Sequence, residues 1–118
     1  MNTEIRRYLD ILRIELADIE SDLLAKEEET GRRFKSNELS YYVTEENLAV
    51  IRQEIAGVRQ MIDTLGEMDF GDIGTIEELT VRLERIVTEK SAEYELPDAV
   101  LVYIKRKLRK VKDFVSVD

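Results

Sequence analysis

The sequence has no cysteine, no histidine and no tryptophan, and it has a single proline among its 118 residues. Without cysteine, neither a disulfide framework nor a catalytic thiol can form. Without histidine, the chain lacks the side chain most used for acid–base catalysis near neutral pH and for binding zinc. We therefore predict no catalytic residue, no cofactor and no bound metal ion. The lack of cysteine also suits the reducing cytoplasm, which is the compartment that we expect.

Long apolar runs are missing as well. Near the N-terminus, charged residues interrupt every apolar stretch, namely Asp10, Arg13, Glu15 and Asp18. We therefore expect neither a signal peptide nor a membrane span. Hydrophobic residues still make up 43% of the chain, which is enough for a buried core, and its length predicts a single helical domain over residues 1–118.

The many acidic residues do not match a known metal-binding pattern. Di-metal sites of helical bundles use Glu-x-x-His motifs, which this chain cannot supply. The segment DFGDIGTIEELT, residues 69–80, has the glycine and isoleucine of a calcium-binding loop. However, Gly71 and Ile73 occupy positions that need oxygen ligands, and Thr80 stands where a bidentate glutamate is expected.

What the sequence does contain is an apolar pattern repeated in four segments. In each segment the apolar residues alternate mainly at spacings of four and three, which places them along one stripe of an α-helix. The four stripes are Ile5, Leu9, Leu12, Leu16, Ile19 and Leu23; Leu48, Ile51, Ile55, Val58, Ile62 and Leu65; Ile76, Leu79, Leu83 and Ile86; and Leu101, Ile104, Leu108, Val111 and Val115. This pattern predicts an all-α protein, an antiparallel four-helix bundle built from two helical hairpins with coiled-coil-like heptad packing.

Capping residues predict where the helices begin. Asn2 or Thr3 can cap the first helix and Thr44 the second, and Thr75 opens a capping box at the third. Pro97 suits the first turn of the fourth helix. The predicted helices cover residues 3–29, 45–65, 76–91 and 97–114, with an inter-hairpin loop at 66–75.

The segment between the first two stripes, residues 25–47, is far longer than the usual connection between bundle helices. It is either a helical hairpin tip that projects from the bundle or a loop that folds back. Basic and aromatic residues gather in it, namely Arg32, Arg33, Phe34, Tyr41 and Tyr42. Because arginine and tyrosine are frequent anchors of protein interfaces, we predict that this group binds a protein partner. The alternative is that the aromatic rings cover the open end of the hairpin.

The last predicted helix is basic although the whole chain has a net charge of -8. Its cations, apart from Lys107, form a predicted basic face of Lys105, Arg106, Arg109, Lys110 and Lys112. These cations can neutralise acidic faces of neighbouring helices, or they can bind phosphate groups. Since domains that bind nucleic acid non-specifically are usually basic overall, we favour the internal role.

Two helices carry apolar residues outside their stripes, namely Tyr8, Ile11, Ile14 and Leu24 in the first and Val100, Val102 and Tyr103 in the last. A helix that is apolar on more than one face is either central in its fold or shared with a partner. We therefore expect a homo-oligomer, most simply a two-fold dimer. The alternative is that these side chains complete a broad core within one chain.

The segment LDILRIELADIESDLL, residues 9–24, resembles the opening helix of the all-helical chorismate mutases. In that family an arginine in this context binds a substrate carboxylate, so the resemblance implies that role for Arg13. A buried Arg13 or Arg52 beside a polar cavity would support a small helical enzyme, and a dry apolar core would argue against one.

The sequence favours a non-enzymatic helical protein-interaction module that acts as an adaptor, a regulator or an assembly factor, as a homodimer in the cytoplasm. The first alternative is an accessory protein that binds nucleic acid through the basic residues of segments 32–35 and 105–112. The second is a small helical enzyme that binds a carboxylate substrate through arginine. We expect no association with a membrane.

Overall fold

A computed structural model describes residues 2–116 of the chain. These residues form four α-helices and no strand: α1 (Thr3–Lys35), α2 (Tyr41–Gly66), α3 (Ile76–Glu93) and α4 (Asp98–Val115). The contacts between the helices are those of a helical bundle, which measures 54 × 31 × 19 Å. Within residues 2–116, none of the helices has the length and apolar character needed to cross a membrane.

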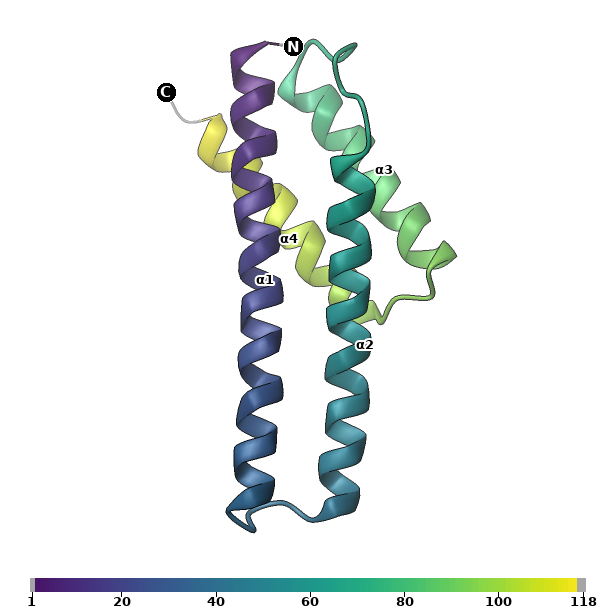
Figure 1. Ribbon diagram of the computed structural model, residues 1–118. Coiled ribbons are helices and arrows are strands. Elements are labelled where there is room, and N and C mark those ends of the chain that lie inside the picture. The colour runs from purple at the N-terminus through teal and green to yellow at the C-terminus, as the bar shows by residue number, and fades with distance from the viewer. Residues whose placement is uncertain (1, 117–118) are drawn as a thin grey trace.

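The two long helices, α1 and α2, lie side by side and are joined at one end by residues 36–40 (Figure 1). Helix α1 also packs on α4, and α3 packs chiefly on α4. Helices α3 and α4 lie obliquely across the half of the α1–α2 pair that is near the N-terminus (Figure 1). The joined end of the pair therefore projects well beyond the other two helices.

The core is apolar and draws on all four helices. Most of the predicted stripe residues are buried in it, and Leu9, Ile51, Ile62, Leu65 and Leu101 are partly buried against it. Tyr8, which lies outside the predicted stripe, is also buried completely, and its hydroxyl donates a hydrogen bond to the backbone carbonyl of Leu108 at 2.8 Å. Tyr8 and Val100 thus belong to the core of a single chain, whereas Ile14, Val102 and Tyr103 are exposed.

Two of the predicted helix caps are confirmed. The side chain of Asn2 accepts a hydrogen bond from the backbone N–H of Ile5, and Thr75 accepts one from Glu78. The predicted cap of the second helix is wrong, because Ser40 rather than Thr44 accepts the bond at its start. Thr44 lies in the first turn of α2, where it is buried and donates its hydroxyl hydrogen to the carbonyl of Ser40.

The first helix continues to Lys35, beyond its predicted end at about residue 29, and α2 begins at Tyr41 rather than at 45. The apolar stripe stops earlier, but the residues that follow it are good helix formers, and the helix does not need an apolar stripe to continue. Asn37, two residues after the end of α1, has a φ of 60°, and the N–H of Glu38 donates a hydrogen bond to the carbonyl of Arg33 at 2.9 Å. This is the hydrogen-bond pattern of a left-handed helix C-cap.

Candidate functional site

The five residues predicted to bind a partner lie together at the end of the α1–α2 hairpin. We call Arg32, Arg33, Phe34, Tyr41 and Tyr42 the tip group. The first three belong to the last turn of α1 and the two tyrosines open α2, so the short connection brings them close together. All five are exposed.

The two tyrosine rings of the tip group are largely exposed at the end of the hairpin. Tyr41 and Tyr42 are 68% and 70% exposed, and Phe34 is 39% exposed. The only ring contact within the group is an edge contact between Phe34 and Tyr41, whose centroids are 6.1 Å apart. An apolar surface of this kind, presented beside arginines, is typical of an interface anchor.

The interior of the hairpin near the tip has little apolar packing. Thr30 and Thr44 are buried there, and each donates its hydroxyl hydrogen to a backbone carbonyl of its own helix, at 2.9 and 2.8 Å. Leu48 is buried but lies outside the main hydrophobic cluster. With so little apolar packing, the tip contributes little to the stability of the fold.

The cations of the tip group have little competition from neighbouring carboxylates. Arg32 lies 3.9 Å from Glu28 on the preceding turn, and both side chains are well exposed, so the pair is weak. Arg33 makes no ion pair within the described residues. Both guanidinium groups therefore remain available to a carboxylate on another molecule.

The basic face of α4 divides into two parts. Lys110 lies 3.1 Å from Glu15 of α1, next to Lys107 at 2.6 Å, and Arg109 lies 3.8 Å from Glu84 of α3. These cations neutralise acidic side chains of the neighbouring helices α1 and α3. Within residues 2–116, the remaining members of the face, Lys105, Arg106 and Lys112, make no ion pair, and Arg106 is exposed.

Glu15 forms ion pairs between α1 and α4, and no pattern in the sequence marked it as a site residue. Its carboxylate is 16% exposed and is held by two lysines. The hydrogen bonds from Lys107 and Lys110 lower the pKa of Glu15, and the bond to Glu15 raises the pKa of Lys107. Glu15 and Lys107 lie 92 positions apart in the sequence, so no local pattern could have paired them.

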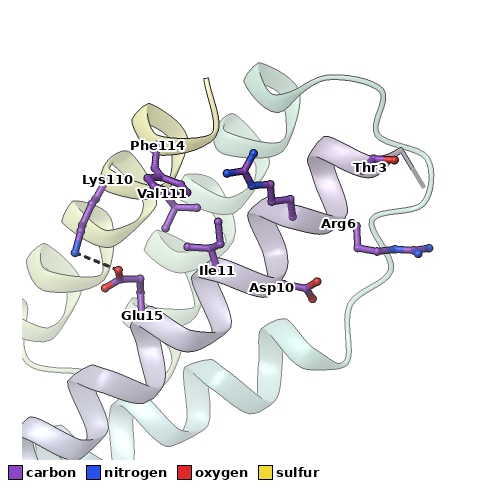
Figure 2. A pocket seen from close by; sticks show the side chains of 9 residues that line it. Thr3, Arg6, Asp10, Ile11, Glu15, Lys110, Val111 and Phe114 are labelled. Atoms are coloured by element: carbon purple, nitrogen blue, oxygen red, sulfur yellow. Dashed lines mark ion pairs between the residues drawn. The ribbon is translucent and has the colours of Figure 1, made fainter. Parts of the chain in front are cut away.

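A groove of about 660 Å³ runs between the first half of α1 and the last turns of α4. Ile11 of α1 and Val111 and Phe114 of α4 lie close together in it, as Figure 2 shows. Charged residues of both signs line its sides, namely Arg6, Arg7, Asp10, Glu15 and Lys110. The guanidinium of Arg7 lies 5.3 Å from the centre of the Phe114 ring. This groove is the second candidate site. Ile11, Lys110 and Val111 stood out in the sequence for separate reasons, but no sequence pattern placed them together.

The arginines expected of a carboxylate-binding enzyme are not buried. Arg13 is exposed beside a small hollow of about 190 Å³, whose lining is mostly apolar. Arg52 is also exposed, and its Nε donates a hydrogen bond to Glu27 at 2.9 Å. Neither arginine thus has the buried polar surroundings that would concentrate its charge on a substrate.

Among residues 2–116, no group of three or more acidic side chains is arranged to hold a metal ion. No protein-family model matches the chain, and no curated protein or solved structure matches it.

Proposed function

We propose that this chain is a non-enzymatic helical protein-interaction module, an adaptor, regulator or assembly factor that works as a homodimer in the cytoplasm. The observation that carries the proposal is the tip group, which holds exposed tyrosines and arginines at the projecting end of the hairpin. Among residues 2–116, Val81 is the one other large hydrophobic side chain that is as exposed as these two tyrosines.

The tip group is well suited to a partner and has little role in the fold. Tyrosine buries a large area with few rotatable bonds, and arginine forms paired hydrogen bonds with carboxylates. Neither tyrosine belongs to the hydrophobic cluster. A partner that covered both rings would gain the free energy of their burial while the core of this chain stayed unchanged.

We further propose that the helices form an antiparallel bundle of two hairpins with heptad packing. Support comes from two ion pairs between α1 and α2, Glu20 with Arg59 at 2.6 Å and Glu27 with Arg52 at 2.9 Å. A step of seven residues forward along α1 corresponds to a step of seven residues back along α2. That register suits two antiparallel helices that keep a seven-residue repeat in contact.

The tip is tested with quantitative affinity enrichment from an extract of cells that make the protein, followed by direct binding to each purified partner. The variant Tyr41→Ser/Tyr42→Ser should lose those partners, and Arg32→Ser/Arg33→Ser should weaken their binding. Val81→Ser is the matched control, because Val81 is 69% exposed but lies on α3, and it should bind as the unchanged protein does. Equal binding by the tyrosine variant would contradict the proposal.

The alternative of a nucleic-acid accessory protein draws support from one observation on α4, where Lys105, Arg106 and Lys112 make no ion pair with any residue of the described range 2–116. Fluorescence anisotropy of labelled duplex and single-stranded DNA and RNA, at two salt concentrations, tests it. Binding at micromolar concentration that weakens steeply with salt, and that Arg106→Ser reduces, would favour this alternative. Absence of binding at low salt would leave these cations as counter-charge for an acidic protein.

A further inference from the structure

The side of α1 that borders the groove with α4 carries a short repeat of its own. Arg7, Ile11, Ile14 and Asp18 follow one another at spacings of four, three and four, so they lie in one row along the helix. Ile14 is 62% exposed and Ile11 is only partly buried, while Arg7 and Asp18 are exposed. Ile11 packs in part against the core of its own chain, whereas the exposure of Ile14 in the middle of the same row is not explained by that packing.

We propose that this row, the α1 seam, binds the α1 seam of a second copy in antiparallel orientation about a two-fold axis. The proposal rests on the homodimer of the proposed function and names its contact surface. In this register Ile11 of each copy meets Ile14 of the other. Arg7 of each copy then meets Asp18 of the other, so both ends of the seam join opposite charges.

The seam is complementary to itself because its charges are placed symmetrically about its two isoleucines. Reversing the row exchanges the positive and the negative end, and this is the operation that a two-fold axis performs on the facing helix. A purely acidic or purely basic partner would complement only one end of the seam. A second copy of the chain complements the positive end and the negative end at once.

The groove between α1 and α4 extends the apolar surface of the seam. Ile11 lines the groove together with Val111 and Phe114, and Phe114 is 57% exposed. When Ile14 of the second copy packs on Ile11, it lies near this apolar floor. Arg7 rests on the Phe114 ring at one end of the same surface. The dimer contact thus buries apolar surface of α4 that the α1 helix of the same chain leaves exposed to solvent.

The interface is small, so we expect a weak dimer with a Kd of about 10–100 µM. Sedimentation equilibrium of the full chain, over loading concentrations from about 5 to 500 µM, should show a mass that rises from 13.8 kDa toward twice that value. Ile14→Glu should keep the protein monomeric across the range. Val81→Glu, at an equally exposed valine of α3, is the control and should dimerise normally.

A charge exchange tests the register. Arg7→Asp places like charges at both ends of the seam, and so does Asp18→Arg, so each single variant should weaken the dimer by about tenfold or more. The double variant restores opposite charges and should dimerise again. A mixture of the two single variants should form a heterodimer, because each Asp then meets an Arg. Circular dichroism melting of each variant verifies that it remains folded.

The outcomes separate this proposal from the proposed function. A chain that stays monomeric at 500 µM would overturn the α1 seam and the homodimer, but not partner binding by the tip group. A dimer that Ile14→Glu leaves intact, or single charge variants that dimerise normally, would overturn the seam alone.

Discussion

Replacing Tyr8 with phenylalanine should destabilise the protein at neutral pH, and the difference should vanish near pH 11. Tyr8 is completely buried in the core, where its hydroxyl donates a hydrogen bond to the backbone carbonyl of Leu108 at 2.8 Å. Phenylalanine keeps the ring and its packing, so the substitution removes one oxygen and one hydrogen bond between α1 and α4.

The loss at neutral pH follows from the hydrogen bond. The carbonyl of Leu108 lies within a helix and keeps its helical N–H partner, so it is not left without a hydrogen bond. We therefore expect the free energy of unfolding to fall by about 1 kcal/mol. For a chain of this length that corresponds to a melting temperature lower by roughly 4 °C.

The pH dependence follows from the burial of the phenol. Burial raises the pKa of Tyr8 from 10.0 to about 12. Above pH 10 the phenol of Tyr8 ionises in the unfolded chain but stays largely neutral in the folded one, so ionisation lowers the free energy of the unfolded state and stability falls. At pH 11 this contribution amounts to about 1.4 kcal/mol, close to the value of the hydrogen bond. Tyr8→Phe escapes that loss.

The assay is equilibrium unfolding in urea of the unchanged protein and of Tyr8→Phe, at pH 8 and at pH 11. The lysines and the other tyrosines titrate in both proteins, so the difference between their free energies of unfolding isolates the contribution of Tyr8. Tyr42→Phe, at a tyrosine that is 70% exposed, is the control and should change stability at pH 8 by less than about 0.5 kcal/mol. A difference between Tyr8→Phe and the unchanged protein that is the same at both pH values would refute the reasoning.

Three further predictions concern two helical glycines, the turn after α3 and the ion pairs of Glu15. Gly31→Ala should raise the free energy of unfolding by about 0.5–1 kcal/mol in urea titrations, because Gly31 lies inside a helix and its added Cβ meets nothing within 4 Å. Gly57→Ala should lack that gain, since its Cβ would lie 2.7 Å from Cδ2 of Leu96. Glu95→Gly should raise the melting temperature, with a gain of about 1 kcal/mol, because residue 95 has a φ of 55° that glycine adopts without strain. Glu15→Gln should lower stability by about 1 kcal/mol at pH 7. That difference should disappear in acid denaturation as the pH falls below 4.5 and through the lowered pKa of the folded carboxyl.

The helices of this protein could be predicted from the sequence because their information is local. The stripe of Ile76, Leu79, Leu83 and Ile86 is buried in α3, which begins at the predicted cap Thr75. The ends of α1 and α2 could not be placed in the same way. There the apolar stripe ends before the helix does, and Ser40, four residues before the predicted cap Thr44, accepts the capping hydrogen bond.

The candidate sites also differ in how far apart in the sequence their residues lie. The members of the tip group lie close together in the sequence, so their proximity in space could be predicted, and their role as a binding site stays a prediction. The ion pair of Glu15 with Lys107 and the groove between Ile11 and Phe114 join segments about 100 positions apart. Their formation depends on the angle and rotation at which α4 packs on α1, which periodicity along one helix does not specify.

The two proposed surfaces together specify what the protein would do as a dimer. The α1 seam is centred between residues 12 and 13, and the tip group begins about 20 residues further along the same helix, which is about 30 Å at 1.5 Å per residue. Because the two copies of α1 run in opposite directions across the seam, their tips would point away from each other, about 60 Å apart. One small partner cannot span that distance, so the dimer would hold two partner molecules apart rather than grip one. Such a geometry favours a bridging adaptor or assembly factor over a regulator that acts on a single target, and it predicts two partners bound per dimer.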